Sequence, residues 1–160
     1  MKTISLLISV LIVLFLLVTG CKKDEGSLTV EGYIVGSFIS DELNKETGQT
    51  TGNKTPRGYC IILTNSKNAD NLWPMDFYTF NLPQGLINFP ENILTPEYNG
   101  NNCGPTFFPE NFKKAYKIRF EYQNLPHESE MKFDNGCFTF YQPFPWEDFP
   151  QVTIKNVKQQ

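Results

Sequence analysis

The stretch SLTVEGYIVGSF, residues 27–38, decides the fold class because its apolar residues recur at every second position. Its apolar side consists of Leu28, Val30, Ile34 and Phe38, and its polar side of Thr29, Glu31 and Ser37. A period of two indicates a β-strand that buries one face. Gly32 and Gly36 fall on the apolar side, as expected where a barrel strand bends sharply or meets another backbone.

Five further segments have strand patterns, and together they predict about six short strands. They are GYCIILT (58–64), FYTFNLP (77–83), YKIRFEY (116–122), CFTFY (137–141) and VTIKNV (152–157). The first is a continuous apolar run, which is typical of a strand buried on both faces. The third alternates most clearly, with Tyr116, Ile118, Phe120 and Tyr122 predicted to point inward.

The segments between these strands lack a regular apolar period. Residues 41–57 are predicted to form a polar loop, and residues 84–112 an irregular excursion that contains FPEN twice, at 89–92 and 108–111. The second copy favours a helical turn, because Pro suits the first helical position. Three prolines in QPFPWEDFP forbid regular ladder pairing.

This pattern predicts a mostly β domain, most simply a small closed barrel of the OB-like kind. The irregular or short helical excursion would lie between the third and fourth strands and cap one end of the barrel. A β-sandwich is the alternative architecture.

The N-terminus has the features of a secretory signal. Lys2 precedes an apolar run from Ile4 to Val18, and this run is shorter than the roughly 20 residues that a membrane-spanning helix needs. A basic start, a short apolar segment and small residues before a break indicate an export signal over residues 1–20.

The end of this signal, Val18-Thr19-Gly20-Cys21, resembles the lipobox of bacterial lipoproteins. The resemblance implies that Cys21 becomes the acylated first residue and anchors the protein in the outer membrane, since several acyl chains suffice for stable anchoring. Residues 21–27 would then be a charged tether and residues 28–158 one domain. The alternative is an uncleaved helix with a buried Cys21.

The charged run Lys22-Lys23-Asp24-Glu25 has two interpretations. Short charge runs usually form a solvated tether. The run also resembles the export signal of Bacteroidetes lipoproteins, which would place the domain on the cell surface rather than on the periplasmic face.

Composition argues against a nucleic-acid partner and against a helical fold. The whole chain has a net charge of −3, which becomes −4 when Lys2 leaves with the signal, and it lacks a Lys/Arg cluster in sequence. A nucleic-acid partner is therefore not expected, because such binding depends on neutralising phosphates. Abundant Phe and Tyr, together with 11 Pro, argue against a helical bundle.

Three cysteines follow Cys21, and an exported protein can form disulfides. Three thiols allow one bridge and leave one Cys over. The sequence leaves two pairings open, Cys60 with Cys137 and Cys103 with Cys137, beside the alternative that all three are free and buried. A Cys60–Cys137 bridge would close a loop of about 77 residues and stabilise the fold by about 4 kcal/mol.

Five strand segments, GYCIIL, FYTFNLP, KIRFEY, GCFTF and VTIKNV, resemble an uncharacterised set of small Bacteroidetes-type lipoproteins. The resemblance covers roughly residues 28–157. It implies a bridge between Cys60 and Cys137, whereas Cys103 lies in an insertion that the pattern does not explain. It supplies no catalytic residue.

The sequence contains no recognisable catalytic or metal-binding pattern, so we predict neither an enzyme nor a cofactor. His127 is the single histidine, and one His beside Glu128 and Glu130 lacks the three or four ligands that zinc requires. We expect it in a surface loop. No G-x-S-x-G elbow, phosphate-binding loop or calcium loop is present.

Trp73, Tyr98 and Trp146 lie in predicted loops beside polar residues and could stack on a sugar ring. The alternative, which is commoner in small β domains, is that they anchor loops to the core. The sequence therefore predicts a membrane-anchored, non-catalytic binding module. Its contact surface would combine residues 41–57 and 84–112, and its partner would be a glycan or an envelope protein. A periplasmic assembly factor is the alternative function.

Overall fold

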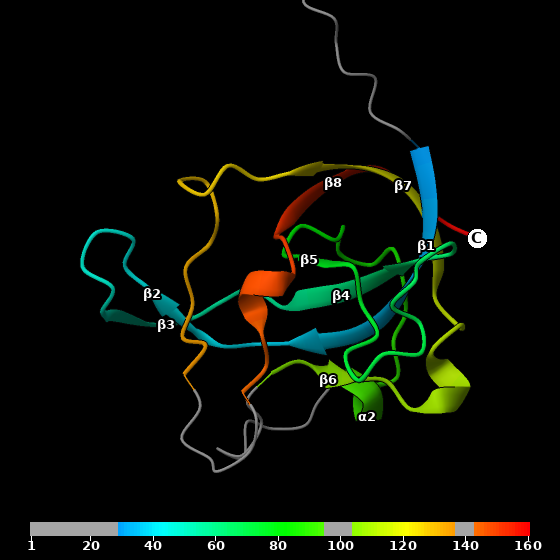
Figure 1. The fold of residues 1–160 in the computed structure, drawn as a ribbon, viewed down its shortest axis with the longest axis horizontal. Coiled ribbons are helices and arrows are strands. Elements are labelled where there is room, and N and C mark those ends of the chain that lie inside the picture. Colours follow the sequence, from blue (N-terminus) through cyan, green and yellow to red (C-terminus); the bar gives the residue numbers. More distant parts are fainter. Residues whose placement is uncertain (1–28, 95–103, 137–142) are drawn as a thin grey trace, which may run out of the picture.

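The computed structural model describes residues 29–94, 104–136 and 143–160, and within them the chain is mostly β (Figure 1). The strands are β1 (Thr29–Phe38), β2 (Asp41–Leu43), β3 (Thr50–Lys54), β4 (Gly58–Leu63), β5 (Phe77–Thr79), β6 (Thr106–Phe107), β7 (Lys117–Asn124) and β8 (Val152–Gln159). Three helical turns accompany them: α2 (Glu91–Leu94), η1 (Glu110–Phe112) and η2 (Trp146–Asp148). The predicted fold class, mostly β, is confirmed.

Strand β1 is the centre of a six-stranded antiparallel sheet. The strand order is β5-β4-β1-β7-β8, and β6 also pairs with β1. Residues 29–33 of β1 pair with β7 on one edge, with Gly32 opposite Ile118, and residues 32–38 pair with β4 on the other, with Phe38 opposite Gly58. One long strand therefore connects both halves of the sheet.

The two ends of this strand order are joined by polar contacts. A parallel bridge pairs Tyr78 with Gln151, and the Tyr78 N–H donates to the Pro150 carbonyl over 3.2 Å. The Asn81 amide donates to the Ile154 carbonyl over 2.9 Å and accepts from the Ile154 N–H over 3.0 Å. These contacts hold the end of β5 beside the start of β8.

One face of the sheet carries the main apolar core. From the strands it contains Ile34, Ile61, Phe77, Ile118, Phe120, Val152 and Ile154. Each such buried side chain stabilises the fold by about 1.5–3 kcal/mol. The excursion between β5 and β7 adds Ile87, Ile93, Phe108 and Tyr116 to the same cluster. The excursion therefore covers this core, and the predicted inward direction of Ile118 and Phe120 is confirmed.

Both FPEN copies begin helical turns. Helix α2 starts at Glu91 directly after Pro90, and η1 starts at Glu110 directly after Pro109. The turn predicted for the second copy is confirmed, although it is a 3-10 turn. The first copy behaves in the same way: the Pro90 carbonyl accepts from the Ile93 N–H over 3.1 Å, as the Pro109 carbonyl accepts from the Phe112 N–H over 2.8 Å. In both copies the proline precedes the turn, whereas the sequence predicted a proline at the first helical position of the second copy.

The opposite face of β1, β4 and β5 carries a second cluster, which we call the aromatic cluster. Its buried members are Val35, Phe38, Cys60, Ile62, Met75, Tyr78, Phe133, Phe144 and Trp146. Strand β4 is therefore buried on both faces, as its continuous apolar run predicts. Phe144 and Trp146 come from the loop between β7 and β8, so this loop covers its own sheet.

A β-bulge in β1 corrects one prediction. The register with β4 shifts by one residue between Ile34 and Gly36. Phe38 was expected on the same face as Ile34, but the extra residue moves it to the aromatic cluster. Gly36 has the expected close backbone approach, because a Cβ there would lie 2.7 Å from the Thr106 carbonyl oxygen of β6.

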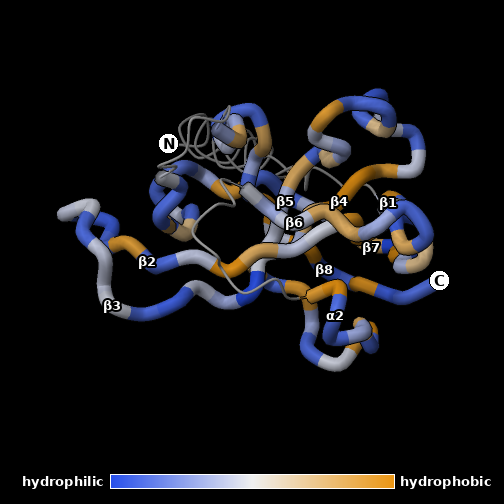
Figure 2. Tube along the Cα trace, turned by 90° about the horizontal axis from the view of Figure 1, so that it is seen from below, coloured by the Kyte–Doolittle hydropathy of each residue, from blue (hydrophilic) through white to orange (hydrophobic). Residues whose placement is uncertain are grey.

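The prediction of a structureless loop at residues 41–57 is wrong. These residues contain the antiparallel pair β2–β3, which projects from the body of the molecule as a separate two-stranded sheet (Figure 1). Every residue of β3 is exposed. The hairpin is mainly hydrophilic, in contrast to the central strands (Figure 2).

Candidate functional site

Two long loops meet at the end of the molecule that carries the hairpin. An antiparallel bridge joins Glu42 of β2 to Phe133 of the β7–β8 loop. The Leu43 N–H donates to the Lys132 carbonyl over 2.9 Å, and the Asp134 N–H donates to the Asp41 carbonyl over 2.8 Å. Residues 132–134 therefore pair with β2 through this bridge and its two flanking hydrogen bonds. We call residues 40–55 and 128–134 together the two-loop surface.

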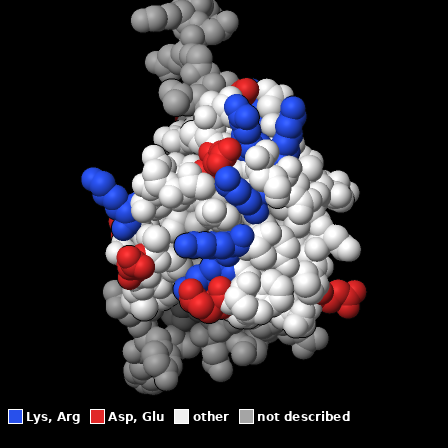
Figure 3. All heavy atoms as spheres, turned by 90° about the vertical axis from the view of Figure 1, so that its right-hand side faces the viewer, with Lys and Arg blue, Asp and Glu red and all other residues white. Residues whose placement is uncertain are grey.

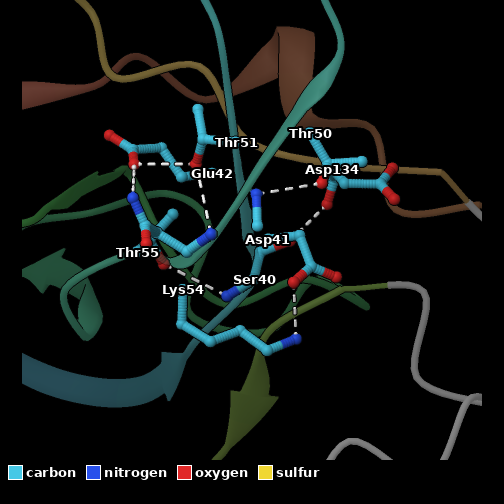
Figure 4. A network of polar contacts seen from close by, with 10 residues as sticks. Ser40, Asp41, Glu42, Thr50, Thr51, Lys54, Thr55 and Asp134 are labelled. Atoms are coloured by element: carbon cyan, nitrogen blue, oxygen red, sulfur yellow. Dashed lines mark hydrogen bonds and ion pairs between the residues drawn. The ribbon is translucent and has the colours of Figure 1, made fainter.

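Side chains within the hairpin reinforce this arrangement (Figure 4). Lys54 Nζ lies 2.7 Å from Asp41 Oδ1, and Glu42 Oε2 accepts a hydrogen bond of 3.1 Å from Thr51 Oγ1. The Lys54 and Asp41 side chains are 60% and 42% exposed, so the ion pair contributes less than about 1 kcal/mol. The backbone bonds, rather than this ion pair, hold the two loops together.

The base of the hairpin is fixed at Ser40 and Thr55. The Thr55 N–H donates to the Ser40 carbonyl over 2.8 Å, and the Ser40 N–H donates to Thr55 Oγ1 over 3.1 Å. The Ser40 hydroxyl donates to the Asp134 carbonyl of the other loop (Figure 4). Thr55 is buried, so the chain leaves and re-enters the sheet at one defined position.

The turn of the hairpin depends on Asn44 and Gly48. Asn44 Oδ1 accepts hydrogen bonds of 2.9 Å from the N–H groups of Glu46 and Thr47. Gly48 has a φ angle of +68°, which favours glycine. An Asn four residues before a Gly, between two short extended runs, is the sequence signal that could have predicted this hairpin.

His127 lies in an exposed loop beside this surface, as predicted. Its Nδ1 lies 3.0 Å from Glu130 Oε2, and its Nε2 lies 3.2 Å from Lys132 Nζ. Because an ammonium group only donates, Nε2 accepts and Nδ1 carries the hydrogen that faces Glu130. Among residues 29–94, 104–136 and 143–160, no three His, Cys, Asp or Glu side chains gather in a metal-binding group.

Of the predicted sugar-stacking residues, Trp73 and Trp146 both lie against the aromatic cluster. Trp146 is only 9% exposed and lies in the aromatic cluster, with ring centroids 4.7 Å from Phe38 and 4.7 Å from Phe144. Trp73 is half-buried against the same cluster, 5.0 Å from Phe144. Tyr98 lies outside the described residues. The position of Trp146 fits the alternative that the sequence left open, in which it anchors a loop, here the β7–β8 loop, to the core.

The described part of the chain contains one of the four cysteines. Cys60 is fully buried in the aromatic cluster and forms no disulfide with another described residue, and burial raises the pKa of its thiol. Burial also raises the pKa of the neighbouring Tyr78 hydroxyl, with a smaller contribution from Glu130. Cys21, Cys103 and Cys137 lie outside the described residues, so the acylation and the bridge to Cys137 stay predictions.

The second predicted contact region, residues 84–112, is described in part, and α2 and η1 lie within it. Most of its described apolar residues face the main core, whereas Phe107 packs against the aromatic cluster. Arg57 at the base of the hairpin loop donates to the Leu94 carbonyl. The structure therefore links the two predicted regions through one arginine. The hairpin makes more hydrogen bonds with residues 131–134 than with the described part of residues 84–112, and the sequence did not indicate this contact.

Comparison with known proteins yields no match to a family model, to a curated protein or to a solved structure. Within the described residues, no helix combines the length and the apolar character needed to cross a membrane.

Proposed function

We propose that this chain is a lipid-anchored, non-catalytic binding module of the bacterial cell envelope, and that it contacts its partner through the two-loop surface. The anchor is assigned to Cys21 on the lipobox-like sequence Val18-Thr19-Gly20-Cys21. The observation that carries the binding role is the cross-loop hydrogen bonding between residues 41–43 and 132–134.

Within this proposal the sheet belongs to a barrel of the OB type. The strand order β5-β4-β1-β7-β8 and the parallel bridge of Tyr78 with Gln151 support this architecture. Barrels of this type bind ligands on the face of their second and third strands and on the loops that flank it. When the strands of the main sheet are counted along the chain without the hairpin β2–β3, the second and third are β4 and β5. The aromatic cluster covers the outer face of these two strands. The two flanking loops are therefore the surface left for a partner.

The chemistry of the two-loop surface favours a polar partner, either a glycan or another envelope protein. Its exposed side chains include Thr51, Asn53 and Lys54, which offer hydroxyl, amide and ammonium groups. A surface that is already ordered loses little conformational entropy on binding, which improves affinity without additional contacts.

Site-specific photo-crosslinking in intact cells tests the contact surface. A photoreactive residue at Thr51 should give a discrete crosslinked product, whereas the same residue at Leu72, which is 71% exposed and lies outside the two-loop surface, should not. Equal products from both positions, or products from Leu72 alone, would contradict the proposed surface.

Two further measurements test the location. Incorporation of labelled palmitate should occur in the natural chain and disappear in Cys21→Ser. Protease treatment of intact cells, with lysed cells as the control, should remove a tag at Gln160 if the domain faces outward. Protection until lysis would instead favour the second candidate function, a periplasmic assembly factor.

A further inference from the structure

The outer face of the sheet is covered over one half only. The aromatic cluster packs on β4, β5 and the second half of β1. The outer face of β7, β8 and the first half of β1 instead carries charged side chains that are exposed or half-exposed. We call this second half the basic face.

The strand register assembles the basic face from residues that are far apart in sequence. Arg119 stands opposite both Glu31 and Lys158, and Glu121 stands opposite Lys155. Lys117 Nζ lies 2.6 Å from Glu31 Oε2 on the same face. The basic face contains four cations, Lys117, Arg119, Lys155 and Lys158, and two anions, Glu31 and Glu121. The resulting charge of +2 (4 − 2) contrasts with −3 for the whole chain.

Lys and Arg side chains gather on the side of the molecule that bears β1, β7 and the C-terminus (Figure 3). Within this face, Arg119 and Lys158 are direct cross-strand partners. Like charges placed directly opposite each other destabilise a sheet. An external anion bound to this face would offset that repulsion.

The described chain enters the sheet beside the basic face, because its first residue, Thr29, pairs with Glu121. The proposed anchor Cys21 precedes Thr29 by eight residues (29 − 21), which can span at most about 27 Å. A tether of this length keeps the basic face within reach of the membrane that holds the anchor. The effective concentration of lipid headgroups at the face is therefore high, and weak attraction is enough to orient the domain.

We propose that the basic face docks on the surface of a bilayer that contains anionic phospholipids. This inference rests on the proposed lipid anchor at Cys21. Lys and Arg side chains near such a surface are attracted by its negative potential. The hairpin β2–β3 lies at the opposite end of the molecule from the basic face (Figure 1). Docking therefore turns the two-loop surface away from the membrane, toward its partner.

Lysine reactivity of the acylated full chain on vesicles tests this orientation. The protein is reconstituted on vesicles of phosphatidylcholine alone, or with 30% phosphatidylglycerol, and acetylated by acetic anhydride. Peptide mass spectrometry then gives the rate at Lys155 relative to Lys67, which is exposed outside the basic face. We expect phosphatidylglycerol to lower this ratio at least threefold, and 0.5 M salt to restore it. An unchanged ratio would overturn the docking.

The variant Lys158→Glu separates docking from folding. It replaces the like-charge pair with an opposite-charge pair beside Arg119, so the sheet should be at least as stable, while the face loses two units of positive charge. We expect the protection of Lys155 to disappear in this variant. The matched charge change Lys67→Glu should leave that protection intact, with Lys54 as the reference lysine.

Flotation of the same vesicles distinguishes the anchor from the docking. Flotation with neutral vesicles but without protection of Lys155 overturns the docking and keeps the anchor. Flotation with phosphatidylglycerol vesicles alone overturns the anchor and supports the docking. Flotation with neither overturns both. Equal protection of Lys155 by soluble polyphosphate, without vesicles, would reveal a general polyanion site and overturn the membrane assignment.

Discussion

Asn81 shows how one polar side chain holds two distant strands. Its amide makes two hydrogen bonds with the backbone of Ile154, and its Oδ1 also accepts from Thr79 Oγ1 over 2.6 Å. The Asn81 side chain therefore acts as a short piece of β-ladder where β5 and β8 are no longer regular. The partner of Asn81 lies 73 residues away in the sequence, so no local sequence pattern reveals this contact.

Replacing Asn81 with Ala should lower the free energy of unfolding by about 2–3 kcal/mol, because it leaves the Ile154 N–H and carbonyl groups without their partner. Urea denaturation measures this change. Asn71→Ala is the matched control, since Asn71 is exposed and its side-chain amide donates to the nearby Asn68 side chain, and it should cost less than about 0.5 kcal/mol. Equal costs for both variants would contradict the role of Asn81.

The Glu31–Lys117 pair predicts a pH dependence. The hydrogen bond from Lys117 lowers the pKa of Glu31, and the same bond raises the pKa of Lys117. A lowered carboxyl pKa contributes stability above its ordinary value of 4.5, and this contribution disappears as the pH falls through the pKa of the folded protein. Glu31→Gln should therefore be less stable than the natural chain at neutral pH.

Urea denaturation of the natural chain and of Glu31→Gln at several pH values measures this effect. The difference between them should be fully present at neutral pH, and should disappear as the pH falls below the lowered pKa of Glu31. A difference that persists after Glu31 is protonated would show that the substitution acts through packing rather than through charge.

At the scale of the elements, the β7–β8 loop shows why the sequence alone does not reveal whether a loop tryptophan is exposed to a ligand. Trp146 lies in the turn η2 among three prolines, a setting typical of a surface loop. The same loop folds back so that Trp146 contacts Phe38, Tyr78 and Phe133. Burial here depends on tertiary contacts that composition does not encode.

Trp146→Ala should lower the free energy of unfolding by about 3–5 kcal/mol, because it opens a cavity in the aromatic cluster. Thermal unfolding followed by circular dichroism measures the loss. Trp73→Ala, at the half-buried margin of the cluster, is the comparison and should cost less. An unchanged unfolding temperature in Trp146→Ala, together with lost retention on a polysaccharide gel, would restore the sugar-stacking interpretation.

The elements that the sequence predicted and those that it missed differ in what stabilises them. Strands β1, β4, β7 and β8 bury apolar side chains at regular intervals, so their period is visible in the sequence. The β2–β3 pair has no apolar period, because polar side chains and residues 131–134 hold it. The basic face was missed for another reason: cross-strand register, not sequence distance, brings Arg119 beside Lys158.

At the scale of the whole molecule, the state of Cys60 bears on the proposed export, because an exported protein can form disulfides. The thiol is fully buried, so native protein should not react with iodoacetamide at this position. Mass spectrometry after labelling in native buffer, in urea, and in urea with reductant tests both its burial and its pairing. Labelling in urea without reductant indicates a free thiol, whereas labelling only after reduction indicates the bridge predicted with Cys137.

The outer edge of β3 has a consequence if the proposed lipid anchor holds the protein in the plane of a membrane. The N–H groups of Gly52 and Asn53 donate to the hydroxyls of Thr50 and Thr51 in the same strand, each over 3.2 Å. An open strand edge is a template for pairing with another chain. Under the proposed lipid anchor, copies would meet in one leaflet. Because these amides already have partners, they are not available to pair one hairpin with another, and each hairpin would stay available to its proposed partner.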